Sequence, residues 1–556
     1  MLQLPPPAGD DAVALARELS LTRTAAAVLV ARGLRETEPT TRFLEPRLAH
    51  LTPPDAMKDR AEAVARLAHA VRAKERICVF GDYDADGVTA AALVTDVLRA
   101  LGGEVVPLLA DRFNGGYGLS GPALARVLDT RATLLVTCDC GSSDHERLDS
   151  VRRAGVDAVV IDHHRVPDAP LPALAFLNPH RPDCGFLYKG LASVGLALSI
   201  AAGVRAELGA ELDLRRWLDF VAIGTIGDVA PLDGDNRPLV RAGLGLLAHG
   251  GRPGTRALAE VAKCGTATPT GEDVSFRLAP RINAPGRLDK PDLALALLLS
   301  TSDDEARRLA AEVEAFCTRR KEVERAVVVE ALAMLDDPGL AALPCIVLAK
   351  QGWHPGVVGI VAGRLASRFG KPTVIVALDG ATGRGSARTP AGFSVYDALA
   401  RSRDALVGFG GHHAAAGVEV AANRVEAFRE RFAEACAAMG VPAPRRASDG
   451  EALLEPGDHP ARVTHDLARF EPCGQGNPAP RVAIADARVL GAREVRGGHL
   501  RLWVDVGGRP LSCFGAEMGP LAATVGARVR LVGALRPDTW TGGGAVEMRL
   551  VAAEPA

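Results

Sequence analysis

The sequence has 556 residues, of which 48% are apolar and 24% are charged, and its formal net charge at pH 7 is −2. This length predicts three or four domains, and the near-zero charge gives no global basic field, so that a polyanion would need a local groove. No stretch approaches the roughly 18 apolar residues of a membrane span, and the start of the chain lacks the pattern of a signal peptide. Ten cysteines without a Cys-x-x-Cys pair predict reduced thiols. We therefore expect a cytoplasmic protein without membrane association.

The chain before Glu75 shows helical periodicity after a proline-rich start. From Glu75 on, short runs of Val, Ile and Leu alternate with helical patterns, which is typical of a doubly wound parallel sheet covered on both faces. In such sheets ligands bind beyond the carboxyl ends of the strands. The expected strands are Arg76–Phe80, Glu104–Leu109, Thr133–Cys138 and Asp157–Ile161, with a helix over Val88–Leu101.

An unbroken run without glycine or proline extends from Ser302 to Leu335, with a serine at the N-cap and acidic residues in the first turn. As one helix it would span roughly 50 Å. That length favours a connection between two lobes. Two helices with an unmarked break are the alternative.

A second α/β segment is expected from Pro344 to about Met439, with strands at Cys345–Ala349 and Thr373–Ala377. The proline-rich stretch 442–446 is typical of a linker. Beyond it, short strands separated by glycine-rich turns predict a small β-barrel. The expected barrel strands include Val482–Ala485, Leu500–Val506 and Arg528–Val532.

Acidic and histidine residues gather where the predicted strands end and in one apolar run. Like charges so close repel one another, and each ionised carboxylate is costly to bury without a positive partner. Carboxylates with one or two imidazoles suit Mn²⁺ or Mg²⁺ better than a structural zinc. The clusters are Asp82, Asp84 and Asp86 in "DYDADG", Asp139 in "TCDCG", His163 and His164 in "IDHH", and Asp228 in "IGTIGDVAPL".

These four motifs resemble, in order and spacing, the metal-site motifs of the DHH phosphoesterase superfamily. The stretches "RINAPGR", "GWHPGVVGIVAGRLA", "GRGSARTPAGFSVYDAL" and "GGHHAAAG" are similar to the RecJ branch of single-strand-specific 5′ exonucleases. The resemblance begins near Glu75 and continues to the C-terminus. It implies a DHH catalytic domain over 51–300 after an N-terminal helical segment over 1–50, a connecting helix over 301–338, a DHH-associated domain over 339–442, and an OB-fold over 443–556.

The resemblance implies two divalent ions, Mn²⁺ or Mg²⁺, bridged by Asp139. Such a pair lowers the pKa of a bound water and stabilises the leaving oxygen of a phosphodiester. The catalytic residues would be Asp139, His163 and His164, with His164 facing the substrate phosphate. The implied metal ligands are Asp82, Asp84, Asp86, Asp139, His163 and Asp228.

The resemblance also implies a set of substrate-binding residues in both lobes. Arg112, Ser386 and Arg388 would hold a 5′-terminal phosphate and so fix polarity, and His412 would approach the scissile phosphate. Trp353 is either a stacking platform or packed in the core, with packing favoured because aromatic residues make up only 4% of the chain. The implied substrate-binding residues are Arg112, Arg281, Asn283, Ser386, Arg388 and His412. Trp503, Phe514 and Trp540 would stack on single strands in the barrel.

The expected function is a single-stranded-DNA-specific 5′→3′ exonuclease that releases 5′-mononucleotides in recombination and repair. One alternative is a DHH phosphodiesterase for short oligonucleotides or cyclic dinucleotides, although that class usually ends after the second lobe. Another is a non-catalytic, DHH-type DNA-binding scaffold, although such relatives have lost metal carboxylates that this sequence retains. The implied partners are single-stranded DNA, single-strand DNA-binding protein and a RecQ-type helicase, and the expected state is a monomer.

Overall fold

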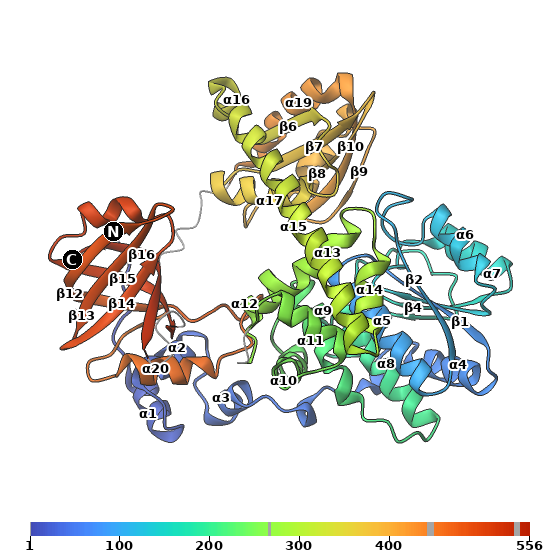
Figure 1. The fold of residues 1–556 in the computed structure, drawn as a ribbon, viewed down its shortest axis with the longest axis horizontal. Helices are drawn as coiled ribbons and strands as arrows, with labels where there is room; N and C mark the ends of the chain where they lie inside the picture. The colour runs from blue at the N-terminus through green and yellow to red at the C-terminus, as the bar shows by residue number, and fades with distance from the viewer. Residues whose placement is uncertain (1, 265–267, 442–449, 539–544) are drawn as a thin grey trace.

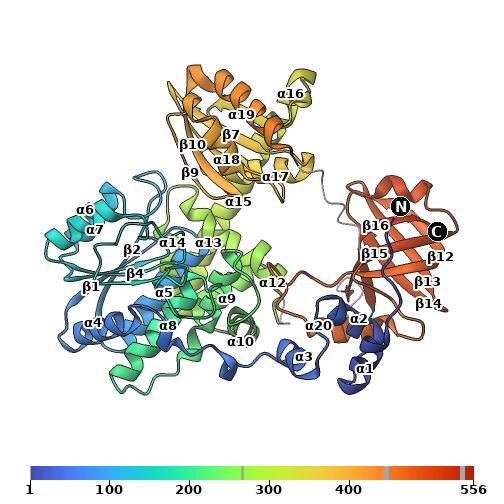
Figure 2. The same cartoon turned by 180° about the vertical axis from the view of Figure 1, so that it is seen from behind.

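The computed structural model describes residues 2–264, 268–441, 450–538 and 545–556. The chain forms three lobes, each built on its own sheet (Figures 1 and 2). A larger α/β lobe lies at one side, a smaller α/β lobe lies above it, and a β-barrel lies opposite. This architecture confirms the predicted fold class.

The first lobe contains a five-stranded, fully parallel sheet in the order β2-β1-β3-β4-β5. The middle strands are buried along their length, which explains their continuous apolar sequence. Cα partners such as Gly81 and Cys138 bring the carboxyl ends of β1 and β3 to the same edge. The strands are β1 (Arg76–Gly81), β2 (Glu104–Leu109), β3 (Leu134–Cys138), β4 (Asp157–Ile161) and β5 (Ala175–Leu177).

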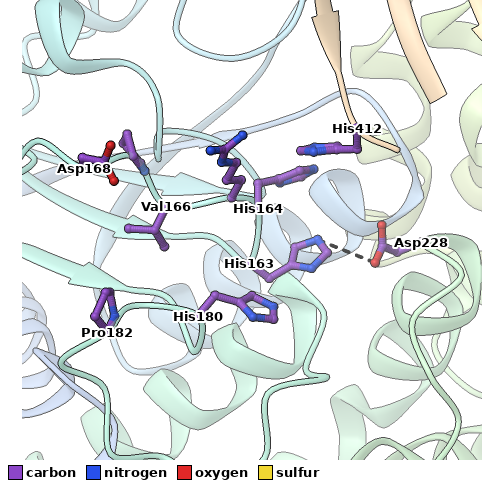
Figure 3. A pocket seen from close by; sticks show the side chains of 10 residues that line it. His163, His164, Val166, Asp168, His180, Pro182, Asp228 and His412 are labelled. Carbon is purple, nitrogen blue, oxygen red and sulfur yellow. Dashed lines mark ion pairs between the residues drawn. The ribbon is translucent and has the colours of Figure 1, made fainter. Parts of the chain in front are cut away.

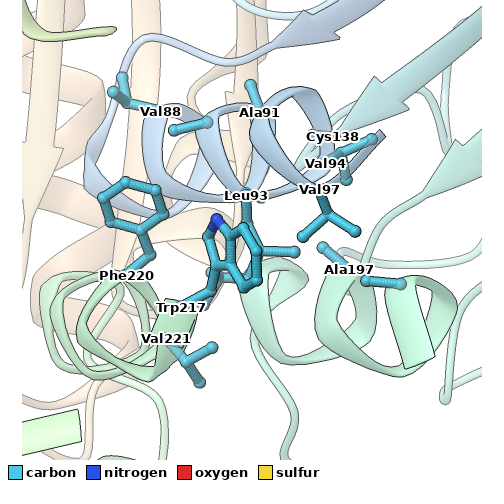
Figure 4. Close-up of a cluster of buried hydrophobic side chains, with 14 of the residues drawn as sticks. Val88, Ala91, Leu93, Val94, Val97, Cys138, Ala197, Trp217, Phe220 and Val221 are labelled. Carbon is cyan, nitrogen blue, oxygen red and sulfur yellow. The ribbon is translucent and has the colours of Figure 1, made fainter. Parts of the chain in front are cut away.

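Helices cover both faces of this sheet. α5 has buried residues on all sides because it lies between the sheet and a further layer of helices, where Leu93 and Val97 meet Trp217 and Phe220 (Figure 4). The helices of this lobe are α4 (Arg60–Arg72), α5 (Ala85–Ala100), α6 (Gly121–Asp129), α7 (His145–Arg153), α8 (Ser193–Glu207), α9 (Leu218–Gly227), α10 (Asn236–Ala248), α11 (Pro253–Val261), the short α12 (Gly271–Asp273), α13 (Ala279–Gly286) and α14 (Asp292–Leu299). A π-helical turn, Val274–Leu278, joins α12 to α13.

One continuous helix, α15 (Asp303–Met334), connects the two α/β lobes. Ser302 caps it by accepting a hydrogen bond from the backbone N–H of Glu305, and three acidic residues in the first turn favour the helix dipole. At 32 residues it is about 48 Å long. The one-helix interpretation was therefore right.

The second lobe contains a mixed sheet in the order β6-β7-β8-β10-β9, in which only β6 and β7 are parallel. The glycine-rich stretch around Ser386 is a regular strand of this sheet, not a free loop. The strands are β6 (Ile346–Gln351), β7 (Thr373–Asp379), β8 (Thr382–Arg388), β9 (Gly408–Gly411) and β10 (Ala415–Ala421). The helices are α16 (Pro338–Ala342), α17 (Val358–Phe369), α18 (Val395–Arg401) and α19 (Val425–Met439).

The third lobe is a barrel in the order β11-β12-β13-β14-β16-β15, closed by a further pairing of β12 with β15. The expected linker 442–446 lies outside the described residues. The strands are β11 (Ala452–Leu453), β12 (Val482–Val495), β13 (His499–Val506), β14 (Arg509–Gly515), β15 (Arg528–Pro537) and β16 (Val546–Pro555). The helix α20 (Pro460–Ala468) lies between β11 and β12 in the chain.

The N-terminal helices share the core of this barrel. Leu15 and Leu29 are buried in the same apolar cluster as Leu502 and Leu531. Asp458 accepts hydrogen bonds from the backbone N–H and hydroxyl of Thr24. The three helices are α1 (Asp10–Glu18), α2 (Arg23–Ala31) and α3 (Thr37–Leu44). The buried apolar side chains of these three helices thus pack against the C-terminal lobe.

Candidate metal centre

The three aspartates after β1 have different roles in the structure. Asp84 caps α5, and one of its oxygens accepts hydrogen bonds from the backbone N–H groups of Asp86 and Gly87. Asp82 is 2% exposed, and its Oδ1 atom has no hydrogen-bond partner. Gly87 permits this tight turn, because a Cβ atom there would lie 2.6 Å from the carbonyl oxygen of Asp82. Asp82 and Asp84 therefore each keep a free oxygen at the edge of the sheet.

Asp86 faces the N-terminus of α8. Its two oxygens accept the backbone N–H groups of Ser193 at 2.7 Å and Val194 at 2.9 Å. A carboxylate at this position satisfies backbone donors that have no partner within the helix. Asp86 also lies beside the histidines, since its Oδ2 is 3.9 Å from Nε2 of His163.

Asp139 follows β3 in a left-handed backbone conformation, with φ of 64°. Aspartate adopts this region more readily than most residues. The hydroxyl of Ser193 donates to Oδ1 of Asp139 at 3.0 Å, and the hydroxyl of Tyr117 donates to its backbone carbonyl at 2.9 Å. The side chain is thereby held in the space between the aspartates after β1 and the histidines after β4.

His163 and His164 follow β4, and Asp162 orients both. Asp162 Oδ1 accepts the two backbone N–H groups and lies 2.8 Å from Nδ1 of His164. Burial lowers the pKa of His164, but the contact with Asp162 outweighs burial and raises this pKa to about 9. Burial likewise raises the pKa of Asp162, but its hydrogen bonds and the charge of His164 outweigh burial and hold this pKa below its ordinary value. His164 is thus a cation at neutral pH. Sequence reasoning missed Asp162 as well as the supporting residues Ser193 and Tyr117.

His163 differs from its neighbour. Burial and the adjacent charge of His164 lower its pKa to about 4, so the ring is neutral with a lone pair available. Its buried Nε2 atom has no hydrogen-bond partner. This atom lies 3.3 Å from Asp139 Oδ1 and 3.6 Å from Asp228 Oδ2, and Asp228 stands at the C-terminal end of α9 (Figure 3).

The structure brings together all six residues expected to bind metal. Their ligand atoms form overlapping triads within 4.8 Å, namely Asp82, Asp84 and Asp139; Asp86, His163 and Asp228; and Asp139, His163 and His164. Burial, together with neighbouring carboxylates, raises the pKa of Asp86 to about 7 and that of Asp228 to about 9. Two buried ligand atoms in this cluster, Oδ1 of Asp82 and Nε2 of His163, have no hydrogen-bond partner. Crowded carboxylates together with such atoms fit divalent cations that prefer oxygen and imidazole ligands.

An open pocket of about 810 Å³ adjoins the metal triads. It receives His412 from the turn after β9, whose ring stacks against that of His164 with centroids 6.2 Å apart (Figure 3). The second lobe therefore reaches the histidines of the first through His412. The pocket is lined by His163, His164, Arg165, Val166, Pro167, Asp168, His180, Pro182, Asp228 and His412.

A positively charged cluster, which is not part of the lining of this pocket, includes Arg112 and Arg388. The guanidinium of Arg112 stacks over Tyr83 at 4.3 Å from the ring centre, and its Nε atom has no partner. Arg388 Nη1 donates to the hydroxyl of Ser386 at 2.8 Å. Burial and then the charge of Arg112 lower the pKa of Arg388, so the two cations are close together.

The first turn of α17 completes this cluster. A Cβ atom on Gly359 would lie 3.0 Å from Ser386 Oγ and 3.2 Å from Arg388 Nη2. Glycine at this position lets Ser386 and Arg388 approach the N-terminus of α17 closely. Together with Arg112 they form a group of two cations, a hydroxyl and a helix N-terminus. This combination suits a phosphate.

Two further residues expected to bind substrate lie on α13. Arg281 is 7% exposed and forms an ion pair with Glu314 of α15, at 2.5 Å from Nε. Asn283, on the same helix α13, is half-buried, and its Oδ1 atom has no hydrogen-bond partner. The structure thus places Arg281 at the contact between α13 and α15.

The aromatic residues also have distinct environments. Trp353 is 5% exposed, and its Nε1 donates to Glu330 at 2.6 Å, which agrees with the packing interpretation. In the barrel, Arg493 stacks over Trp503 and Arg501 over Phe514. Trp540 lies outside the described residues.

Comparison with protein-family models divides the chain into three parts. Residues 76–225 match the DHH family, N-terminal domain; residues 342–438 match the DHHA1 domain; and residues 451–552 match the RecJ OB domain. No described helix is both long and apolar enough to span a membrane.

Curated relatives match nearly the whole chain. It is 33% identical over 547 residues to the single-stranded-DNA-specific exonuclease RecJ of Bacillus subtilis (strain 168), covering 96% of this chain and 68% of that protein. It is 38% identical over 483 residues to the exonuclease of the same name in Dickeya dadantii (strain 3937), covering 81% and 82%. Among solved structures, RecJ from Thermus thermophilus in complex with Mn²⁺ superposes with a TM-score of 0.84 and 32% identity, over all of this chain and 79% of that one. The Mg²⁺ complex gives a TM-score of 0.79 at 31% identity, over all of this chain and 78% of that one.

Proposed function

This chain belongs to the RecJ family of single-stranded-DNA-specific exonucleases, and on that premise we propose that it is a metal-dependent exonuclease that removes 5′-mononucleotides from the 5′ ends of single-stranded DNA during recombination and repair. The observation that carries the proposal is the convergence of carboxylates from separate segments and of His163 on overlapping triads within 4.8 Å.

The ligand set supports two Mn²⁺ or Mg²⁺ ions, held by Asp82, Asp84, Asp86, Asp139, His163 and Asp228. When bound, such ions supply an activated water and stabilise charge on the leaving oxygen. The neutral ring of His163 has the lone pair that a metal requires, and the Oδ1 atom of Asp82 has no hydrogen-bond partner that would compete with a metal. Asp139 belongs to two of the triads, which supports a bridging position.

The histidines of the two lobes support contact with the scissile phosphate. His164 carries a proton at neutral pH because Asp162 accepts from its Nδ1 atom, so its other face can donate to a phosphate oxygen. His412 approaches from the opposite lobe and closes over the same space. A preformed donor of this kind stabilises charge that increases in the transition state.

The 5′→3′ polarity rests on the cluster of Arg112, Ser386 and Arg388. Two cations and a hydroxyl beside a helix N-terminus hold a doubly charged terminal phosphate more strongly than a singly charged internal one. A strand whose 5′ phosphate occupies this cluster would present its first internal linkage to the metal triads. Only a strand end can bind in this way.

The test is degradation of 50-nucleotide strands with Mn²⁺ or Mg²⁺. We expect a 5′-labelled strand to release labelled mononucleotide at once, whereas a 3′-labelled strand shortens from its unlabelled end. Stepwise loss of label from the 3′ end would refute the polarity. Preference for dinucleotides over 50-mers would favour the short-oligonucleotide phosphodiesterase, and the absence of Mn²⁺ binding in calorimetry would favour the non-catalytic scaffold.

Further aspects of the proposal concern partners and location. The barrel, with cation and ring pairs at Trp503 and Phe514, supports contact with single-stranded DNA. A monomeric state, a cytoplasmic location, and contact with single-strand DNA-binding protein or a RecQ-type helicase follow from the family resemblance alone. Sedimentation of the purified chain with and without each partner tests the state and the contacts.

A further inference from the structure

The pocket beside the metal triads extends beyond the residues that the reaction uses. Its near side consists of His163, His164, Asp228 and His412, whereas its far side is formed by Arg165 to Asp168, together with His180 and Pro182. The 5′-phosphate cluster is not part of it. The far side is therefore space for substrate that lies beyond the cleaved linkage.

The order of charged groups across the site gives a direction. Arg112 acts electrostatically on Asp82, the first carboxylate of the triads. Asp139 shares one triad with Asp82 and another with His163, and His163 and Asp228 line the pocket. The triads thus connect the carboxylate beside Arg112 to the pocket, so a strand that begins at Arg112 and crosses the triads reaches the pocket.

Arg165 is the cation of this pocket. Its side chain is exposed, and among the residues that the structure describes no carboxylate lies within ion-pair distance of it. Arg165 lines the same pocket as His412. Burial contributes most to lowering the pKa of His412, and the positive charges of His164 and then Arg165 lower it further, so Arg165 lies close to the catalytic groups. An unpaired arginine at the wall of a nuclease pocket fits a phosphate oxygen.

His180 and Pro182 line the same part of the pocket as Arg165. The backbone N–H of His180 donates to Asn178 Oδ1 at 2.9 Å, and Asn178 in turn donates to the carbonyl of His164 at 2.8 Å, so this loop is fixed to the metal centre. The exposed ring of His180 lies beside His163 in Figure 3. A flat ring next to a proline is suited to stacking with a base.

We propose that this pocket binds the second nucleotide of the strand, with Arg165 holding the phosphate between nucleotides 2 and 3 and His180 stacking on base 2. The inference rests on the proposed exonuclease function and on its 5′→3′ direction. Asp168, the one carboxylate of the far side, is placed to accept a hydrogen bond from the base or sugar of that nucleotide. Arg165 is thus a specificity residue for strands of at least three nucleotides.

The test combines an uncharged methylphosphonate linkage in the DNA with the substitution Arg165→Ala in the protein. A 5′-phosphorylated decamer carries one methylphosphonate, between nucleotides 2 and 3 or between nucleotides 5 and 6. We expect the first modification, and Arg165→Ala on the native strand, each to lower kcat/KM about tenfold, because a charged hydrogen bond is lost. Together they should lower it no further than either alone, and the modification between nucleotides 5 and 6 should not couple to Arg165.

Two further measurements separate binding from misfolding. In EDTA, fluorescence anisotropy should show that Arg165→Ala reduces the slope of log affinity against log salt by about 0.7, the value for one phosphate contact on a single strand. Arg165→Lys should restore most of this slope. The matched control is Arg368→Ala, an exposed arginine in the last turn of α17, which should behave as wild type.

The stacking part is tested with an abasic site at position 2. It should lower kcat/KM for wild type and for His180→Phe, but leave His180→Ala unchanged. Equal losses from the methylphosphonate in wild type and Arg165→Ala would overturn the assignment of Arg165, and equal losses from the abasic site in all three proteins would overturn that of His180. A wild-type protein inactive on the native decamer would instead refute the proposed function.

Discussion

The Nε2 atom of His163 lies 3.3 Å from Oδ1 of Asp139, although the two residues follow different strands of the sheet. Neither atom is positioned by the other, since Asp162 fixes the backbone of His163 and Ser193 holds Asp139. The neutral nitrogen of His163 and the carboxylate oxygen of Asp139 thus lie close together without a hydrogen bond between them. Two such ligand atoms fit a cation that binds both.

Asp139→Asn should abolish activity while preserving the fold. Asparagine has the same size and tolerates the left-handed backbone of this position, but it removes the charge shared by two triads. We expect at least about 100-fold loss of kcat, the upper range for loss of even an outer-shell partner of a metal. Nuclease assays and Mn²⁺ calorimetry check this. Full activity with weak Mn²⁺ binding would contradict the metal mechanism.

Mn²⁺ should stabilise the first lobe. The metal relieves repulsion among carboxylates that are buried with few positive partners, and it binds only the folded state. At 100 times its dissociation constant a ligand adds about 2.7 kcal/mol. Calorimetric scans with Mn²⁺ and with EDTA should therefore differ by several degrees, and Asp139→Asn should show a much smaller difference. An equal shift in both proteins would place the stabilising metal elsewhere.

Asp86→Ala should reduce stability in addition to any effect on metal. Its oxygens satisfy two buried backbone N–H groups at the start of α8, and each donor left without a partner costs about 1–3 kcal/mol. Urea unfolding in EDTA measures this loss without a contribution from metal. Asp84→Ala is the comparison, because in EDTA the Asp84 side chain caps only the first turn of α5, through one of its oxygens. If Asp86→Ala changed the free energy of unfolding by less than about 0.5 kcal/mol, as an ordinary surface substitution does, water would have replaced the carboxylate.

Arg388→Ala should distinguish strand ends by their chemistry. The guanidinium of Arg388 and the hydroxyl of Ser386 lie beside Gly359 at the start of α17, where a terminal phosphate is proposed to bind. Loss of a charged hydrogen bond of about 1.5–3 kcal/mol predicts a roughly 10- to 100-fold lower kcat/KM on 5′-phosphorylated strands. Strands with a 5′ hydroxyl should be affected several times less. Equal losses on both ends would assign Arg388 to internal phosphates.

Leu29→Ala should destabilise the barrel and not the catalytic lobe. Leu29 is fully buried between α2 and the barrel, and such a truncation costs about 2–5 kcal/mol. Hydrogen exchange should accelerate in β12 to β16 and remain unchanged in β1 to β4. Leu93→Ala, within the core of the first lobe, should give the reverse pattern. Uniform acceleration in both variants would mean that the lobes unfold as one unit.

Patterns local in the sequence predicted the local structure well. The strands at Glu104–Leu109 and Asp157–Ile161 were expected with the observed bounds. A short, mainly apolar run bounded by turn residues is typical of a strand in a parallel sheet. The 32-residue helix α15 followed from its cap and from the absence of breakers. The metal cluster followed from several carboxylates at successive strand ends.

The sequence did not reveal roles that depend on the direction in which a side chain points in the folded structure. Asp162 and Asp139 each follow a strand, but only the folded structure shows that Asp162 faces backbone N–H groups and His164. Arg281 stands in a motif typical of phosphate contact, but Glu314, on a different helix, lies within reach of its guanidinium. The periodicity of α2 indicated an apolar face without saying that a barrel at the other end of the chain would cover it.

The shared core of the first helices and the last lobe has a consequence for biosynthesis. Residues near Leu29 leave the ribosome long before residues 482–555 exist, and at 5–20 residues per second the interval is roughly 20 to 100 s. During that time the apolar face of α2 has no native surface to cover it. Until the end of the chain has been translated, this part of the nascent chain is therefore exposed and can be bound by chaperones.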